Sequence, residues 1–411
     1  MREMKDSGIE WIADIPEHWS VSKIGGLYSL RVTKVSDRDY PPLSVTNKGI
    51  LPQLETAAKT NAHDDRKLVC KGDFAINSRS DRRGSCGISS YTGSVSLINT
   101  ILRPMTEMHP QYYNWLFHTI QFGDEFYKWG HGIVDDLWTT GWQDMKKISI
   151  PTPPITEQAV ISDFLDEQCA EIDSLISDIQ SQIEALEEYK RSVITEAVTK
   201  GLDPDVEMRD SGVQWIVEIP THWTLIRIGS LYGLRTQKVS DIDYPPLSVT
   251  KMGVLPQLDT VAKTNAHDDR KLVVKGDFVI NSRSDRRGSC GISDYTGSVS
   301  LINTVLFPIT EMNPRYYNWY FHTVGFADEF YRWGHGIVDD LWTTGWQDMK
   351  NILISVPPLD EQQRIADYLD SKCAEIDNII TEKKQQIETI EEYKKSLIFE
   401  YVTGKKEVVN E

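Results

Sequence analysis

The chain has 411 residues, 40% of them hydrophobic and 26% charged, a composition typical of a folded soluble protein with more than one domain. The longest apolar runs are a few residues long and the N-terminus has no apolar signal core, so neither a membrane span nor a secretory signal is predicted and a cytoplasmic location is expected. The formal net charge of −17 argues against a nucleic-acid partner, unless the acidic residues are concentrated away from the contact surface.

The acidic residues are in fact concentrated in two segments. Residues 1–150 contain 18 basic and 18 acidic residues, whereas residues 151–200 contain 3 basic and 11 acidic ones. Residues 355–411 contain 8 basic and 13 acidic residues. The rest of the chain is close to neutral, and it can therefore carry a local basic surface despite the overall charge.

The second half of the chain repeats the first half. Residues 4–200 align with residues 208–404 at a constant shift of 204 positions without a gap, and about 112 of the first 147 aligned positions are identical. Self-similarity of this kind is the sequence signature of a duplicated structural unit. The two halves are therefore predicted to share one fold.

Each half begins with a segment rich in strand-forming residues and turns. The stretches "YPPLSVT", "GDFAINS" and "SVSLINTILRP" are separated by Gly and Pro, and one short helical stretch interrupts them. Residues 1–154 are therefore predicted to form a compact α+β domain, and residues 204–358 a second copy of it.

A long helical segment follows each globular domain, predicted at 155–203 and 359–411. Both segments begin after a double proline and contain no Gly or Pro before residues 201 and 404. Apolar residues recur at alternating spacings of four and three, interrupted by Lys190, Lys383 and Lys394, which indicates the seam of a two-helix coiled coil. Because each helix leaves its own domain, we expect antiparallel pairing and a pseudo-two-fold internal repeat.

An arginine-rich stretch, "INSRSDRRGSCGIS", occurs without change at residues 76–89 and 280–293. Guanidinium groups can bond guanine O6 and N7 or a phosphate, and serine hydroxyls can serve either. The aspartate could accept from cytosine N4 or hold an arginine in place, and a surface salt-bridge network is the alternative for the whole loop. The exact duplication favours contact with DNA. The candidate contacts are Ser78, Arg79, Ser80, Asp81, Arg82, Arg83 and Ser85, and in the second copy Ser282, Arg283, Ser284, Asp285, Arg286, Arg287 and Ser289.

A second duplicated stretch, "KTNAHDDRKLV", occupies residues 59–69 and 263–273. Its basic residues suit phosphates, and its asparagine and histidine suit base edges, with adenine the usual partner of asparagine. The adjacent aspartates have no recognised metal-ligand spacing, so no metal site is predicted and a solvated turn is the alternative. The candidate contacts are Lys59, Asn61, His63, Arg66 and Lys67, and in the second copy Lys263, Asn265, His267, Arg270 and Lys271.

The longest identical run, "GHGIVDDLWTTGWQDMK", occupies residues 130–146 and 334–350. His131 and Asp135 fit a contact loop or a structural turn equally well, and Trp138 and Trp142 are expected to pack against the domain. The motifs of phosphate-binding loops, dinucleotide-binding folds, zinc proteases and serine hydrolases are absent. Cys86 has no nearby paired base and is predicted to be a buried structural residue. The sequence therefore predicts no catalytic site.

Three sets of motifs resemble the specificity (S) subunits of type I restriction-modification systems. "MKDSGIEWIADIPEHW" and "MRDSGVQWIVEIPTHW" open the two halves, and "KGDFAINSRSDRRG" recurs with one change, "KGDFVINSRSDRRG". The junctions "IPTPPITEQ" and "VPPLDEQQ" lead into long helices that carry "EEYK". The resemblance covers the full length, in the order recognition domain, helix, recognition domain, helix.

The resemblance implies a non-catalytic reader of double-stranded DNA. The helices would set the spacer of a bipartite site and bind two methyltransferase subunits, which would carry S-adenosylmethionine. Restriction subunits would supply cleavage driven by ATP and Mg, and this chain would hold no cofactor. The DNA-facing loop of the family corresponds to Ser78–Ser85 and Ser282–Ser289.

Members of the family usually carry two dissimilar recognition domains, whereas this chain carries two near-identical ones. The sequence therefore predicts a palindromic bipartite target, in which the same half-site is read on opposite strands. Two alternatives stay open from the sequence alone. The chain could serve a related type II system, or it could be a coiled-coil assembly scaffold that does not contact DNA.

Overall fold

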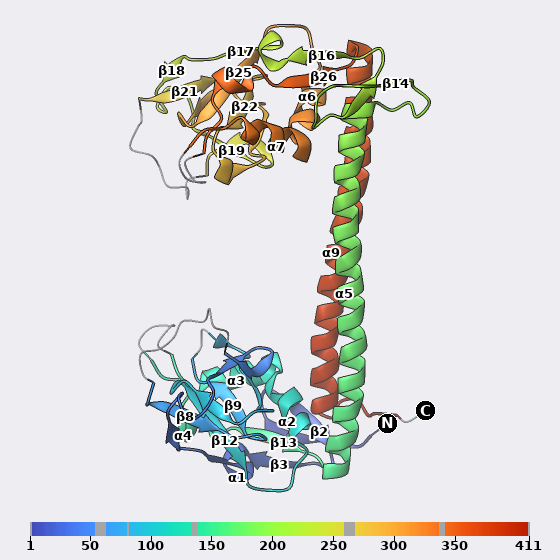
Figure 1. Ribbon diagram of the computed structural model, residues 1–411. Coiled ribbons are helices and arrows are strands. Elements are labelled where there is room, and N and C mark those ends of the chain that lie inside the picture. The colour runs from blue at the N-terminus through green and yellow to red at the C-terminus, as the bar shows by residue number, and fades with distance from the viewer. Residues whose placement is uncertain are drawn as a thin grey trace. The chain divides into compact units, whose positions relative to one another are not determined.

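The computed structural model of the chain describes residues 2–53, 63–79, 82–132, 138–258, 268–336 and 342–409, without the side chain of Ser284. The chain divides into unit 1, Met1–Ile179 with Lys384–Glu411, and unit 2, Gln180–Lys383. Each unit contains one sheet-rich region and one half of each long helix, α5 (Ile155–Lys200) and α9 (Leu359–Val402) (Figure 1). The division therefore falls inside the helices, away from their ends.

Unit 1 is built from short antiparallel strands and the four short helices α1 to α4. A four-stranded sheet has the order β10-β9-β12-β4, a three-stranded sheet has the order β11-β8-β5, and β1-β2, β6-β7 and β13-β3 form pairs. Its elements are β1 (Met4–Ile9), β2 (Ala13–Pro16), β3 (Ser20–Lys23), α1 (Ile24–Leu27), β4 (Tyr28–Leu30), β5 (Lys34–Val35), β6 (Leu43–Thr46), β7 (Gly49–Pro52), β8 (Arg66–Val69), β9 (Phe74–Asn77), β10 (Cys86–Ile88), β11 (Gly93–Val95), β12 (Asn99–Pro104), α2 (Pro110–Phe117), α3 (Ile120–Lys128), α4 (Trp142–Met145) and β13 (Ser149–Thr152).

Unit 2 repeats this arrangement. Its sheets have the orders β17-β25-β22-β23 and β18-β21-β24, with the pairs β14-β15, β16-β26 and β19-β20. Its elements are β14 (Met208–Asp210), β15 (Glu218–Pro220), β16 (Thr224–Arg227), η3 (Ile228–Ser230), β17 (Tyr232–Leu234), β18 (Lys238–Val239), β19 (Leu247–Thr250), β20 (Gly253–Pro256), β21 (Arg270–Val273), β22 (Phe278–Asn281), η4 (Ser284–Arg286), β23 (Cys290–Ile292), β24 (Gly297–Val299), β25 (Asn303–Pro308), α6 (Pro314–Phe321), α7 (Val324–Arg332), α8 (Trp346–Met349) and β26 (Leu353–Val356). The predicted α+β fold of both halves is confirmed.

Aromatic side chains join the short helices to the four-stranded sheet in each unit. In unit 1 the ring of Phe117 lies 4.7 Å from that of Phe74 on the sheet and 4.6 Å from that of Phe122 on α3. All three rings are almost completely buried, and burial of such side chains is the main stabilising contribution to a core. The same helices place the loops that follow β9 and α3.

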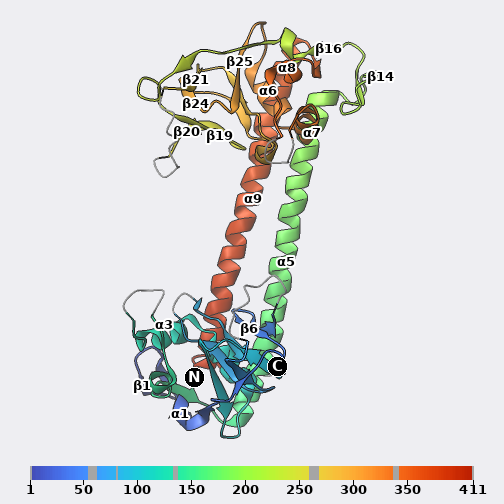
Figure 2. The same cartoon turned by 60° about the vertical axis from the view of Figure 1, so that its left-hand side comes forward.

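Within each unit the two helix halves run antiparallel, because early residues of one contact late residues of the other (Figures 1 and 2). In unit 1, Lys394 Nζ lies 2.6 Å from Asp173 Oδ1. In unit 2, Lys190 Nζ lies 2.6 Å from Asp377 Oδ2, and Lys383 donates to Gln182. The predicted antiparallel pairing is confirmed in both units, and the lysines that interrupt the apolar spacing bond across the helix pair.

The end of α9, which follows the sheet-rich region of unit 2 in the chain, is buried in the sheet-rich region of unit 1. The end of α5 is buried in the sheet-rich region of unit 2 in the same way. Leu397 and Val402, near the end of α9, belong to the core of unit 1, and Tyr112 donates from its hydroxyl to the carbonyl oxygen of Val402 at 2.7 Å. In unit 2 the hydroxyl of Tyr316 donates to the carbonyl oxygen of Val198, near the end of α5, at 3.0 Å. Neither unit can therefore complete its core from one half of the sequence.

The beginning of each long helix is also fixed to the preceding region. Glu157, in the first turn of α5, accepts hydrogen bonds from Trp19 Nε1 at 3.0 Å and His18 at 2.6 Å. Glu361 accepts the equivalent bond from Trp223 Nε1 at 2.7 Å. These acids lie where the helix dipole favours negative charge. No helix in the described part of the chain is long and apolar enough to cross a membrane.

Candidate nucleic-acid interface

The arginine loop, residues 78–85 in unit 1 and 282–289 in unit 2, connects two neighbouring strands of the four-stranded sheet. In unit 1 it follows β9 and precedes β10, and these strands pair antiparallel. Ser80 and Asp81 lie outside the described residues, as does the side chain of Ser284. The loop is thus a hairpin connection presented by a buried strand pair.

The serines at the two ends of the arginine loop point inward. Ser78 is buried, and its hydroxyl bonds that of Thr100 at 2.9 Å. Ser85 is also buried, and its amide donates to the carbonyl oxygen of Arg82 at 3.0 Å. Ser289 is buried in the same way, while Ser282 is half-buried and bonds Thr304. These serines shape the loop, and this placement does not favour them as DNA contacts.

The arginines at the tip of the loop are exposed in both units. Arg82 and Arg83 are exposed in unit 1, and Arg286 and Arg287 are exposed in unit 2, whereas Arg79 and Arg283 are half-buried. Asp285 is exposed, and its carboxylate lies 3.4 Å from Arg286 Nε. The guanidinium groups of Arg82 and Arg286 are therefore accessible to a large planar or anionic ligand.

Arg83 is held in place by residues of α3, and Arg287 by the equivalent residues of α7. Arg83 Nη1 lies 2.8 Å from Asp124 Oδ1, and its guanidinium lies 5.4 Å from the centre of the Tyr127 ring. Arg287 repeats both contacts, at 2.8 Å to Asp328 and 5.5 Å to the ring of Tyr331. An exposed ion pair of this kind contributes little to stability. Its effect here is to orient the guanidinium before any ligand arrives.

A second loop lies directly beside the arginine loop. Arg79 pairs with Thr139, which pairs in turn with His131, and the amide of Thr140 donates to the carbonyl oxygen of Ser78 at 2.9 Å. The His131 side chain is 77% exposed, with Nε2 3.3 Å from Asp144. The structure therefore joins His131 to the arginine loop, which favours a contact loop, while Asp135 lies outside the described residues.

Trp138 fixes this second loop. It is half-buried, and its Nε1 donates to the carbonyl oxygen of Tyr127 at 2.8 Å. Trp142 is half-buried as well and packs against the core of unit 1. Both tryptophans therefore pack against the domain, as expected from the sequence.

Two basic residues of the other duplicated stretch, Arg66 and Lys67, form hydrogen bonds inside the domain. Arg66 is 5% exposed, and its guanidinium donates to Ser94 Oγ and to the Ser94 carbonyl oxygen, both at 2.9 Å. Lys67 donates to the carbonyl oxygen of Asn99 at 2.6 Å, and burial lowers its pKa. Arg270 and Lys271 make the same bonds in unit 2. This burial does not favour DNA contacts for these four residues.

The remaining predicted contacts lie mostly outside the described residues. His63 is described, and its Nδ1 lies 2.9 Å from Asp37 Oδ2. The other predicted contacts of this stretch lie outside the described residues, and they are Lys59, Asn61, Lys263, Asn265 and His267. These five assignments stay predictions.

Asp124 and Tyr127 were not among the candidates from the sequence, although they orient an arginine of the loop. The signal that points to them is the four-residue identity "DEFY" at 124–127 and 328–331, on a helix whose flanking residues differ between the halves. The aspartate and the tyrosine of this run contact Arg83 in unit 1 and Arg287 in unit 2.

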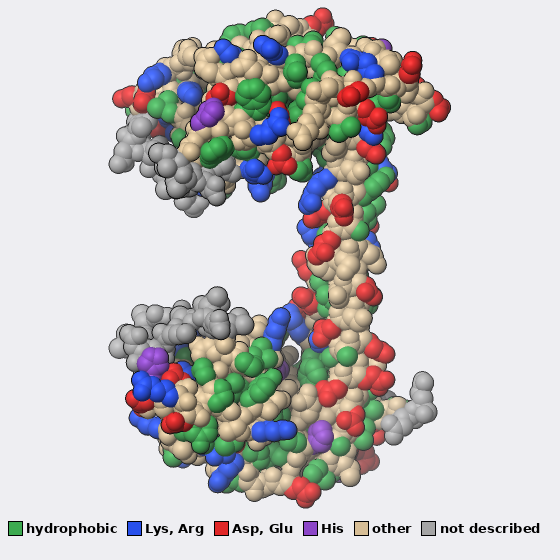
Figure 3. Space-filling view, viewed as in Figure 1, with side chains coloured by type: hydrophobic (Ala, Val, Ile, Leu, Met, Phe, Trp, Pro, Cys, Tyr) green, Lys and Arg blue, Asp and Glu red, His purple; other side chains and the backbone are tan. Residues whose placement is uncertain are grey.

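The described residues hold no group of His, Cys, Asp and Glu that could bind a metal ion. Cys86 is buried, and burial raises the pKa of its thiol far above the usual range, so it cannot serve as a thiolate nucleophile. Acidic side chains gather along α5 and α9, while lysines and arginines are spread over the sheet-rich regions (Figure 3). The exposed arginines of the loop are suited to binding an anionic polymer.

Comparison with known proteins gives one consistent result. The family described as the type I restriction modification DNA specificity domain matches residues 223–389. A candidate type I restriction enzyme MjaX specificity subunit from Methanocaldococcus jannaschii is 27% identical over 273 residues, which is 64% of this chain and 60% of that protein. The type I restriction enzyme MjaVIII specificity subunit from the same organism is 26% identical over 325 residues, covering 72% and 71%. The chain therefore spans less than two thirds of the MjaX relative.

Two solved structures share the fold over almost the whole chain. A chain from a structure of complex assembly and conformational transition in the type I R-M system has a TM-score of 0.72 and 13% identity, covering 95% of this chain and 99% of that one. The HsdS subunit from Thermoanaerobacter tengcongensis has a TM-score of 0.54 and 14% identity, covering 95% and 98%. At this level of identity, the likeness supports the fold alone.

Proposed function

The chain belongs to the specificity subunits of type I restriction-modification systems, and from this premise we propose that it reads the DNA sequence for such a system without catalysing a reaction. The observation that carries the proposal is the arginine loop, present twice with identical sequence and with exposed Arg82 and Arg286 in equivalent positions. The family relationship favours this function over a coiled-coil scaffold that does not contact DNA.

The target is proposed to be an inverted repeat of one half-site, separated by a spacer that is not read. The two arginine loops are identical, and so are the residues that orient them, Asp124 with Tyr127 and Asp328 with Tyr331. Two readers with the same contact residues recognise the same base pairs. Because the helix halves pair antiparallel in each unit, we propose that the readers meet opposite strands of the duplex.

The partners are proposed to be two methyltransferase subunits and the restriction subunits of the same system. S-adenosylmethionine would be bound by the methyltransferase, and ATP and Mg by the restriction subunit, so that this chain would carry no cofactor. The acidic faces of α5 and α9 repel DNA when they are exposed, and partner subunits that cover them would remove that repulsion.

DNA binding should therefore depend on the partner. The chain alone is expected to bind DNA weakly, with an affinity that falls steeply between about 50 and 200 mM salt, because phosphate contacts release counterions. The complex with a methyltransferase subunit of the same system is expected to bind its specific site much more tightly. Gel-shift titrations of the full chain, with and without that subunit, measure both values. Equal affinity in the two titrations, or no preference for any sequence, would contradict the proposal.

A further inference from the structure

The two units differ where each long helix ends. Tyr401 on α9 packs its ring against that of Phe164 on α5, with 4.4 Å between the ring centres. At the position in unit 2 that aligns with Tyr401, the chain has the small, buried residue Ala197, and Tyr368 stands in place of Phe164. The ring that fills this place in unit 1 is therefore missing in unit 2.

The smaller side chain leaves an open groove in unit 2. The groove has a volume of about 720 Å³ and runs between the end of α5, the linker that follows it and the beginning of α9. Two tyrosines line it and are exposed, Tyr189 by 50% and Tyr368 by 40%. Val193 and Ala197 contribute apolar lining. We refer to this feature as the unit-2 groove.

The charge of the unit-2 groove also differs from that of the equivalent place in unit 1. In unit 1, Glu400 forms an ion pair with Lys406 at 2.7 Å. The aligned residues in unit 2 are Glu196 and Leu202, and Glu196 has no ion-pair partner among the residues that the structure describes. Asp203 adds a second exposed carboxylate to the lining, whereas Glu218 is paired with Lys200.

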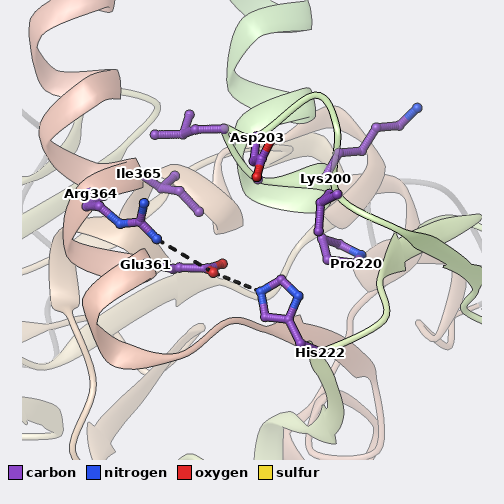
Figure 4. Close-up of a pocket in the computed structure, with 10 residues that line it drawn as sticks. Lys200, Asp203, Pro220, His222, Glu361, Arg364 and Ile365 are labelled. Carbon is purple, nitrogen blue, oxygen red and sulfur yellow. Dashed lines mark hydrogen bonds and ion pairs between the residues drawn. The ribbon is translucent and has the colours of Figure 1, made fainter.

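The other charges around the groove are already paired. Lys372 lies near the two tyrosines and is bonded to Glu375 at 2.9 Å. A smaller cavity of about 90 Å³ borders the same linker, and there Glu361 bonds His222 at 2.8 Å and lies 3.6 Å from Arg364 (Figure 4). Among the residues that the structure describes, Glu196 and Asp203 have no ion-pair partner, and both line the unit-2 groove beside two exposed aromatic rings.

We propose that the unit-2 groove receives a lysine or arginine side chain from one methyltransferase subunit, so that the two methyltransferase subunits bind this chain at inequivalent sites. Aromatic faces and carboxylates together attract a cation, and the apolar lining accepts the aliphatic part of a lysine or arginine side chain. In unit 1 the ring of Tyr401 occupies the equivalent position, and Lys406 pairs with the aligned glutamate, Glu400. The inference rests on the proposed function, since it assumes that the methyltransferase is the partner.

The test is a titration of the full chain with a methyltransferase subunit of the same system, followed by native mass spectrometry and calorimetry. The wild-type chain should bind two subunits with different affinities. Tyr189→Ala should weaken the tighter event by about 5-fold to 30-fold, which corresponds to one cation–π contact. Glu196→Gln should weaken the same event and make it less sensitive to salt. Both positions are exposed, so neither change threatens folding.

The matched controls are Tyr393→Ala and Glu400→Gln, the aligned positions in unit 1, which should leave the tighter event unchanged. Ala197→Tyr, which fills the unit-2 groove, should make the two events alike. Two equal affinities in the wild-type chain, or an unchanged tighter event in Tyr189→Ala, would overturn the inference and leave the proposed function intact. Failure of the chain to bind the methyltransferase at all would overturn both the inference and the proposed partner.

Discussion

Replacing Arg82 and Arg286 together by alanine should weaken specific DNA binding by the complex on the order of 30-fold to 10⁴-fold. Each lost guanine contact costs roughly 1–3 kcal/mol, and every 1.4 kcal/mol is about tenfold in affinity. Binding to an unrelated duplex should change much less, because it depends on phosphate contacts spread over the surface. Dissociation constants for specific and unrelated duplexes at one salt concentration measure the effect.

The single replacements separate the two readers. Arg82→Ala alone should relax one half-site and leave the other unchanged, so that sites selected from a random DNA pool become asymmetric. Arg191→Ala is the control, because Arg191 is an exposed arginine on α5 outside the arginine loops. An unchanged sequence preference in the double variant would show that the arginine loops do not read bases.

Leu397→Ala should destabilise unit 1, although Leu397 lies on the helix that follows the sheet-rich region of unit 2. The side chain is 4% exposed within the core of unit 1, and truncation of a buried leucine costs about 2–5 kcal/mol. Hydrogen exchange should therefore become faster in the strands of unit 1, while unit 2 keeps its protection.

The aligned residue in unit 2 provides the matched control. Val193, on α5, is 8% exposed in the core of unit 2, and Val193→Ala should raise exchange in unit 2 and spare unit 1. Loss of protection in unit 2 after Leu397→Ala would contradict the arrangement of the cores described above.

The repeat and the helix pairing could be predicted because they depend on patterns that extend over many residues, so that single exceptions do not hide them. A gapless shift of 204 positions implies two copies of one fold, and alternating apolar spacing implies a helix pair. The lysines that interrupt the spacing were expected to be polar exceptions. In the structure Lys190 and Lys394 bond aspartates on the facing helix, which explains why the seam tolerates them.

The direction in which a basic side chain points could not be predicted from its residue type. Arg66 and Arg82 both lie in duplicated polar stretches, yet Arg66 is buried against Ser94 and Arg82 is exposed. Tertiary contacts decide between these outcomes, because a buried guanidinium requires acceptors that come from a distant strand. The sequence around Arg66 gives no sign of Ser94, which lies 28 positions away.

Compensating differences between the units were also hidden in the sequence. Tyr320 replaces Leu116, and Ser355 replaces Pro151, at aligned positions. The Tyr320 hydroxyl accepts a hydrogen bond from the Ser355 amide at 3.1 Å. It also forms a hydrogen bond with the Ser355 side-chain hydroxyl at 3.1 Å. Proline has no amide hydrogen and the leucine side chain has no acceptor. The pair Leu116 and Pro151 therefore leaves neither side chain with an unpaired hydrogen-bonding group in unit 1, while Tyr320 and Ser355 bond each other in unit 2. Only the fold reveals that these positions, 35 residues apart, are neighbours.

The most direct measurement is a genome-wide map of methylated bases in cells that express this chain with a methyltransferase subunit of the same system. Arginine loops of identical sequence, with Arg82 and Arg286 exposed, should yield methylation in one bipartite motif, whose second half is the reverse complement of the first. Two unrelated half-sites, or methylation without a common motif, would mean that these loops do not set the sequence that is read.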